Sequence, residues 1–170
     1  MGRTWIYIAF ATVIILIMIL STIFLIEFNI VIALGNRVEN SLIGAGWTGF
    51  GEIDLEKMSE RKMGLENPET RDIFLNKSEA ENTVRKYISE NLGLNSEYIP
   101  TGISYIPHKT NPVIIDEIRI FNPDDLPAID NEITITRTTI KISVQIPMDI
   151  KGVGFVYAPK TVYVDIDSFN

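Results

Sequence analysis

The sequence predicts an α+β fold in which a long N-terminal transmembrane helix continues into a small antiparallel-sheet domain with one further helix. Three observations carry this prediction. The chain has a 22-residue run without a charge near its start, a second segment with helical periodicity and clear end signals, and β-branched runs in its last third. These patterns are typical of a membrane-spanning helix, an amphipathic helix and antiparallel strands.

The uncharged run covers residues 5–26. At about 1.5 Å per residue it spans roughly 33 Å as a helix, which is enough to cross the hydrocarbon core of a bilayer. Trp5 and Tyr7 stand at its start, where aromatic side chains favour the water–lipid boundary. A cleaved signal peptide is the alternative, with small residues near Ala33 and Gly35, but its apolar region is usually only about 7–15 residues long. We therefore expect a retained anchor.

Charges at the two ends of this run predict its orientation. Arg3 and the terminal amine precede it, whereas Glu27 follows it directly. Basic residues favour the cytoplasmic side of a membrane. The sequence thus predicts a single-pass protein of the cell membrane with its N-terminus in the cytoplasm and its C-terminal domain outside.

Helical periodicity continues beyond the predicted membrane segment, to about residue 46. Apolar or small residues recur there every three or four positions, and polar residues fill the other face. Small side chains in this stretch allow a close approach of another helix or a sheet. The candidate packing residues for other subunits, with the boundary carboxylate, are Glu27, Phe28, Val31, Ile32, Gly35, Val38, Leu42 and Ala45. In the alternative interpretation, the stripe covers only the chain's own C-terminal domain.

The remaining chain divides into a polar connection and a compact domain. Glycines and Pro68 interrupt residues 47–77, so we expect a linker or variable loop there. Ser78 and Glu81 fit a capping box, and Gly93 fits a helix end, which predicts a helix over residues 79–92. The predicted organisation is a flank at 1–4, a transmembrane helix at 5–26, its amphipathic continuation at 27–46, a linker at 47–77 and an extracytoplasmic domain at 78–170.

Strands are predicted at residues 114–121, 133–146 and 153–166. In the last of these, Val162, Val164 and Ile166 should face inward, which leaves Asp165 and Asp167 on the solvent side. The apolar phase of the middle run changes from odd to even positions, so we expect a kink, a bulge or a change of partner near residues 137–139. Pro147, Gly152 and Gly154 are expected to mark the turn before the last strand. These strands should form a small antiparallel sheet on which the helices pack.

Composition excludes several classes of function. The chain has no cysteine and one histidine, so a thiol nucleophile and a multi-histidine metal site are both excluded. Its formal charge of −7 argues against binding to nucleic acid, which needs clustered Lys and Arg. His108 lies between two prolines and is expected to be an exposed loop residue. We expect no cofactor and no catalytic site.

An acidic cluster could supply oxygen ligands to calcium, but it lacks the spacing of an EF-hand. Nearby prolines and an asparagine favour a solvated turn instead. The cluster consists of Asp124, Asp125, Asp130 and Glu132.

The layout resembles that of the TadE/TadG-like pseudopilins, which are accessory proteins of tight-adherence pili. The similarity lies in the N-terminal apolar helix, the stretches Ile26-Glu27-Phe28 and 36–40, and a closing strand pair with Ile146-Pro147 at its break. The family often has a glutamate early in the apolar run, whereas Glu27 lies at the far end. The resemblance implies a minor subunit or assembly factor of a pilus or secretion machine, which contacts the bilayer and other pilin-like subunits through its N-terminal helix.

Two further functions stay open at the level of sequence. The acidic domain could be a binding or sensor module for a ligand or another envelope protein, or the chain could be an anchored hydrolase. Glu27 also has two interpretations. It marks the outer membrane boundary, where a charge reaches water at low cost, or it pairs with a cation of a neighbouring subunit.

Overall fold

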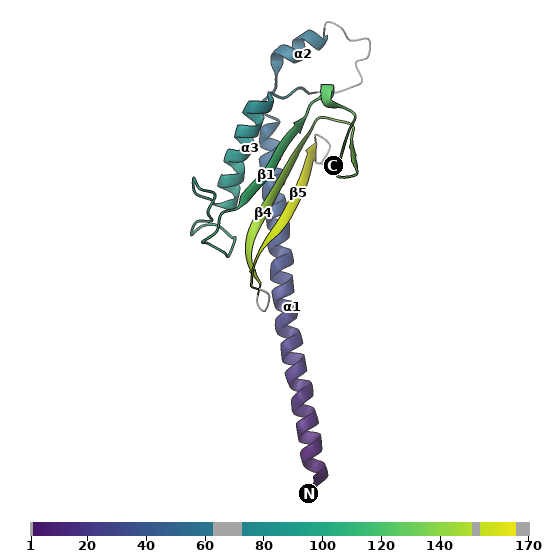
Figure 1. Ribbon diagram of the computed structural model, residues 1–170, viewed down its shortest axis with the longest axis vertical. Coiled ribbons are helices and arrows are strands. Elements are labelled where there is room, and N and C mark those ends of the chain that lie inside the picture. Colours follow the sequence, from purple (N-terminus) through teal and green to yellow (C-terminus); the bar gives the residue numbers. More distant parts are fainter. Residues whose placement is uncertain (1, 63–72, 151–153, 166–170) are drawn as a thin grey trace.

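The computed structural model describes residues 2–62, 73–150 and 154–165 of the chain. It confirms the predicted α+β fold, a long N-terminal helix with a small antiparallel-sheet domain (Figure 1). The elements in order are α1 (Gly2–Gly49), α2 (Leu55–Lys62), α3 (Lys77–Leu92), β1 (Ile114–Phe121), the 3-10 turn η1 (Pro123–Asp125), β2 (Ala128–Asp130), β3 (Ile133–Ile135), β4 (Thr139–Ile150) and β5 (Gly154–Asp165). We call everything after α1 the head.

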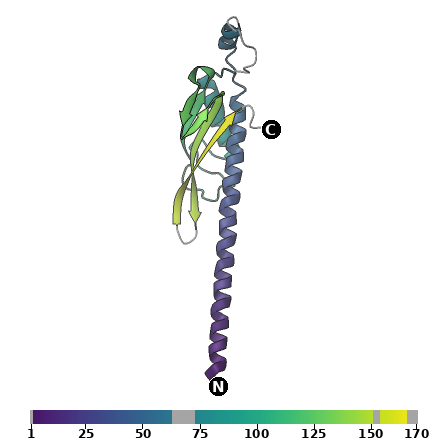
Figure 2. The ribbon, with the colours of Figure 1, turned by 90° about the vertical axis from the view of Figure 1, so that its right-hand side faces the viewer.

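Helix α1 is one continuous rod of 48 residues. Its N-terminal part projects away from the head, and its C-terminal part lies against the sheet and beside α3 (Figures 1 and 2). The helix ends at Gly49, three residues beyond the predicted end, because residues 45–50 still pack into the core of the head. The two ends of one helix therefore lie in different surroundings.

The segment after α1 holds more structure than a loop. It contains α2, and its ends are joined by an isolated antiparallel bridge between Ile53 and Leu75. Phe50, Phe74 and Leu75 are buried. The start and end of the predicted linker thus contribute buried side chains to the interior of the head.

Helix α3 begins two residues before its predicted start. Its N-cap is Asn76, whose side-chain oxygen accepts a hydrogen bond from the Glu79 backbone N–H at 3.4 Å, and not Ser78. Gly93 ends the helix as predicted, in a left-handed conformation at φ 65° that favours glycine. The predicted apolar face is confirmed, since Ala80, Val84, Ile88 and Leu92 are all buried.

The main sheet has three antiparallel strands in the order β1-β4-β5. Strand β1 has the predicted bounds. The predicted middle run is divided between β3 and β4, with residues 136–138 between them, and β3 pairs with β2 in a separate two-stranded sheet. The phase change in the apolar pattern therefore marks a change of sheet partner, one of the three outcomes expected there. Alternation in β4 places Ile140, Ile142 and Val144 in the core.

Pro147 does not mark a turn, contrary to the prediction. It lies within β4, opposite Tyr157 of β5. Strand β1 pairs with β4 only as far as Gln145, so β4 has a neighbour on one side only at Pro147. A residue without an N–H is tolerated at such an edge position. Of the other expected turn and strand residues, Gly154 opens β5, while Gly152, Ile166 and Asp167 lie outside the described residues.

The core of the head lies between the sheet and the two long helices. Buried side chains of α1, α3, β1, β4 and β5 form one cluster. Val162 and Val164 of β5 belong to it, as the alternating pattern predicted. Because α1 supplies part of this cluster, the head is built on the upper part of the helix that projects from it.

Candidate membrane anchor and helix–head interface

The lower part of α1 exposes an apolar surface that no other described part of the chain covers. Of the described side chains in residues 3–30, all are exposed except Glu27, which is half-buried. The helix is long and apolar enough to cross a membrane, and none of its most apolar stretch is buried. A monomer in water rarely exposes such a large contiguous apolar area. The structure therefore fits the predicted single-pass anchor in length, composition and exposure.

Polar side chains in this part of α1 bond to the helix itself. The Thr12 hydroxyl donates a hydrogen bond to the Ile8 carbonyl at 2.9 Å, and the Thr22 hydroxyl donates to the Met18 carbonyl at 2.8 Å. The Asn29 amide reaches the Leu25 carbonyl at 2.8 Å. In hydrocarbon every polar group needs a partner within the protein, and these bonds meet that need.

The predicted packing stripe is divided between two surroundings. Val38, Leu42 and Ala45 are buried in the chain's own core, and Val31 packs at its margin. Phe28 and Ile32 are exposed. Gly35 has no atom within 4 Å of the position that a Cβ would take. The upper stripe thus serves the head, as in the second interpretation given above, while the lower stripe stays open to a partner.

Two glycines let the sheet and α3 approach α1 closely. A Cβ at Gly46 would lie 2.7 Å from Val164 Cγ2 of β5. At Gly49 it would lie 2.7 Å from both Ile140 Cδ1 and Val84 Cγ2. Contacts this short do not occur between real Cβ atoms and their neighbours, so these positions require glycine for the observed packing.

Polar contacts fix the head against α1 below these glycines. The Tyr105 hydroxyl lies 2.8 Å from Ser41 Oγ and donates to the Arg37 carbonyl at 3.1 Å. Lys160 of β5 forms a 2.6 Å ion pair with Glu39 of α1. Burial raises the pKa of Tyr105, while its bond to Ser41 opposes that rise. The tyrosine therefore stays neutral and keeps its proton as a hydrogen-bond donor.

The outer face of the sheet carries a partly buried ionic cluster. Lys141 of β4 is 5% exposed, and its Nζ lies 2.6 Å from Glu117 Oε2 and 2.8 Å from Asp130 Oδ2. The Tyr163 hydroxyl donates to the same Asp130 oxygen at 2.6 Å. Burial alone would lower the pKa of Lys141, but the two carboxylates outweigh it and raise that pKa. The hydrogen bonds from Lys141 and then Tyr163 lower the pKa of Asp130.

This cluster holds the β2–β3 hairpin on the sheet, because Asp130 ends β2 whereas Lys141 and Tyr163 belong to β4 and β5. The acidic cluster singled out in the sequence is thereby divided. Asp125 pairs with Lys77 at 2.8 Å, and Asp130 pairs with Lys141. Among the described residues no three Asp, Glu or His side chains are grouped so as to hold a metal ion.

His108 is not an exposed loop residue as predicted, since its side chain is only 13% exposed. Its Nδ1 lies 2.6 Å from Asp149 Oδ2, and its Nε2 lies 2.7 Å from both Asn111 Oδ1 and Thr110 Oγ1. The ring also packs on Phe155, with 4.7 Å between ring centroids. The Asp149 bond, and then the Asn111 bond, raise the pKa of His108.

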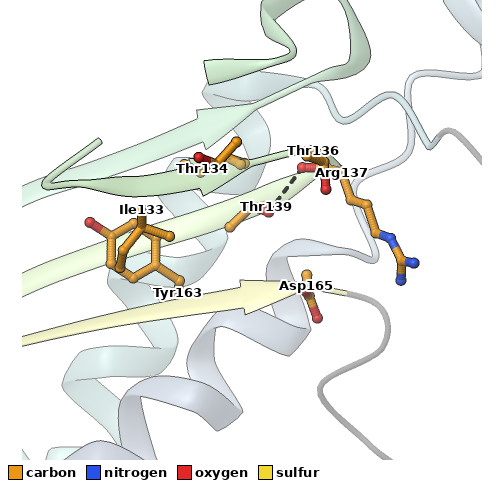
Figure 3. A pocket seen from close by; sticks show the side chains of 8 residues that line it. Ile133, Thr134, Thr136, Arg137, Thr139, Tyr163 and Asp165 are labelled. Carbon is orange, nitrogen blue, oxygen red and sulfur yellow. Dashed lines mark hydrogen bonds between the residues drawn. The ribbon is translucent and has the colours of Figure 1, made fainter. Parts of the chain in front are cut away.

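A hollow of about 290 Å³ lies between β3 and the ends of β4 and β5. Figure 3 shows Ile133 and Tyr163 at one end and Arg137 and Asp165 at the other, with the Thr139 hydroxyl bonded to the Arg137 carbonyl at 2.9 Å. Threonines 134 and 136 also line it. Its lining combines threonine and tyrosine hydroxyls with the Arg137 side chain and the Asp165 carboxylate.

No protein-family model matches the chain, and no curated protein or solved structure is significantly similar to it. The functional interpretation therefore depends on the sequence and the geometry of this molecule.

The sequence predicted the long apolar helix but not the ionic cluster or the histidine contacts. Lys141 stands at an outward position of β4, where a lysine is ordinarily solvated. Its partner Asp130 comes from a short hairpin that the alternating pattern did not separate from β4. His108 and Asp149 are 41 residues apart in sequence. No local signal joins such residues.

Proposed function

We propose that this chain is a membrane-anchored, non-catalytic subunit of a cell-envelope assembly. In this proposal residues 5–26 of α1 cross the bilayer with the N-terminus in the cytoplasm, and the head stands on the outer side. The exposed lower stripe of α1 contacts other subunits. The role is of the pseudopilin kind that the sequence resemblance implies, namely a minor subunit or assembly factor of a tight-adherence-type pilus or a related secretion machine.

One observation carries the proposal. A single unbroken helix has an uncovered apolar lower part and an upper part that is built into the core of its own head. A helix that served only as a core element would be covered along its length. A simple anchor would not need to be rigidly continuous with the domain that it holds. The arrangement suits a subunit that positions a head at a fixed height and orientation over a membrane.

The remaining lower stripe supplies the packing surface. Phe28 and Ile32 are exposed, and Gly35 leaves space beside the helix. Helices associate in membranes through close packing of small residues and not through a hydrophobic force. The open position at Gly35, nine residues beyond the membrane-spanning segment, therefore suits close contact with a second helix outside the bilayer.

Site-specific photocrosslinking in intact cells tests this function. A photoreactive residue replaces Ile32 in one variant and Ile129 in a control variant, both positions being exposed in the structure. The proposal predicts a discrete adduct from position 32, identified by mass spectrometry as a second copy or another single-pass subunit, and none from position 129. Adducts from position 129 alone would favour the alternative, a binding module that acts through its head.

A further inference from the structure

We infer that the paired ends of β4 and β5, around Asp149 and Phe155, rest on the surface of the lipid bilayer and form, with the loop around His108, a second membrane contact beside the anchor. This inference rests on the proposed function, in which residues 5–26 of α1 lie in hydrocarbon. It adds a contact that an anchor alone does not require, made by the head itself.

The register between β5 and α1 sets the height of these paired strand ends. Val164 lies against Gly46, and Lys160 pairs with Glu39. The step of four residues from Lys160 to Val164 therefore covers the same height as the step of seven residues from Glu39 to Gly46. The strand and the helix run in the same direction. The strand begins at Gly154, six residues before Lys160. At the same ratio, Gly154 lies level with about residue 28 of α1, close to the predicted outer boundary of the hydrocarbon.

Figure 1 shows the same relationship, with the hairpin reaching down beside the middle of α1. A second set of contacts agrees. A crevice of about 300 Å³ is lined by Ile30 and Leu34 of α1 together with Tyr105 and Pro107 of the loop. The next loop residue, His108, packs on Phe155 near the start of β5. The loop therefore lies level with residues 30–37 of α1, and His108 connects it to the start of β5.

The side chains at this height suit the lipid headgroup region. Phe155 is 43% exposed although it is a large apolar residue, and its ring meets Tyr157 edge to face at 5.1 Å. The His108 ring also packs on Phe155, with 4.7 Å between ring centroids, and is held by Asp149. Aromatic side chains with polar neighbours are favoured at the membrane–water interface. Phe155 would thus leave water when the anchor enters the bilayer.

The geometry gives this contact a mechanical role. The upper part of α1 and the glycine contacts fix the head to the helix, and the paired strand ends add a support away from the helix axis. A helix alone can tilt in the bilayer over a wide range. A second point of contact would restrict that tilt and hold the head at a defined angle for packing with its neighbours.

Spin-label accessibility tests the contact, and the absence of cysteine makes each label unique. The variants Val13→Cys, Phe155→Cys and Leu55→Cys are labelled in the full chain and placed in phosphatidylcholine–phosphatidylglycerol nanodiscs. Leu55 is the control, since it is exposed on α2 at the end of the molecule opposite the N-terminus (Figure 1). Collisions with oxygen report lipid, and collisions with a water-soluble nickel chelate report the aqueous phase.

The inference predicts an oxygen-accessible label at position 13, a fully aqueous label at position 55, and a label at position 155 that loses most of its collisions with the chelate. A label at position 155 as aqueous as that at position 55, with position 13 in lipid, would overturn this inference and leave the anchor intact. An aqueous label at position 13 would overturn the proposed function, and this inference with it.

Discussion

Individual glycines in α1 have different roles, which their surroundings define. Gly46 faces Val164 at a distance that excludes a Cβ, whereas Gly35 faces open space. In the sequence both appeared as members of one small-residue stripe. The pattern showed that close approach was possible along this face, but it did not show where the sheet lies, because that depends on long-range packing.

The substitution Gly46→Ala should destabilise the head by about 1–3 kcal/mol, since Val164 is β-branched and cannot move aside cheaply. Gly35→Ala is the matched control on the same helix. It should be neutral or should stabilise the chain by up to about 1 kcal/mol, from helix propensity alone. Urea unfolding in detergent micelles measures both. Equal effects at the two positions would contradict the close packing described for Gly46.

His108 should make the stability of the head depend on pH. Nδ1 faces the Asp149 carboxylate and Nε2 faces the Asn111 carbonyl oxygen, and the imidazolium can donate a hydrogen bond to both. The folded-state pKa is raised above the ordinary value of 6.5, so the contribution to stability is complete below that pH and is lost as pH rises through the folded-state pKa. The free energy of unfolding of the His108→Gln variant, measured in urea, should therefore lie further below that of the parent chain at about pH 5 than at about pH 9. If the difference in the free energy of unfolding is the same at both pH values, the imidazolium contributes nothing to the stability of the head.

At the scale of elements, periodicity predicted what local pattern determines. The bounds of β1 and the buried face of α3 follow from the placing of apolar side chains, and both are confirmed. Asn76 and Ser78 are both good N-caps, so local sequence could not choose between them. Pro147 appeared to end a strand, and its tolerance in β4 depends on where β1 stops. The local sequence of a strand does not determine where its neighbouring strand ends.

The β2–β3 hairpin illustrates an element held by charge. Lys141→Met leaves Asp130 without its cation and should loosen the hairpin while β4 and β5 stay paired. Breaking a buried ion pair costs up to about 3–5 kcal/mol, and the partial exposure of Glu117 places the expected loss below that range. Hydrogen exchange should rise in residues 128–135.

Lys86→Met is the control for this change, because Lys86 is exposed and its contacts, a 3.9 Å ion pair with Glu90 and a cation–π contact with Tyr87, lie within α3. Its exchange in residues 128–135 should match that of the parent chain. Unchanged exchange in the Lys141 variant would mean that backbone pairing alone holds the hairpin.

At the scale of the whole molecule, α1 joins an exposed apolar part to a part that is packed in the core of the head. Composition and the length of the uncharged run predict a membrane span for the lower part, because a bilayer sets a simple requirement for length and polarity, and the structure shows that part as an exposed apolar helix. The division of the packing stripe was not predictable, since a face of Val, Leu and Ala suits the core of a head as well as a neighbouring subunit. The structure assigns Val38, Leu42 and Ala45 to the core and leaves Phe28 and Ile32 exposed.

The central claim is that α1 is a retained anchor on which the head is built. Alkaline carbonate extraction of membranes, followed by intact-mass measurement of the extracted protein, tests it most directly. The account predicts that the chain stays in the membrane pellet at its full mass of 19.2 kDa. Release into the soluble fraction, or a mass that lacks the N-terminal apolar segment, would contradict it.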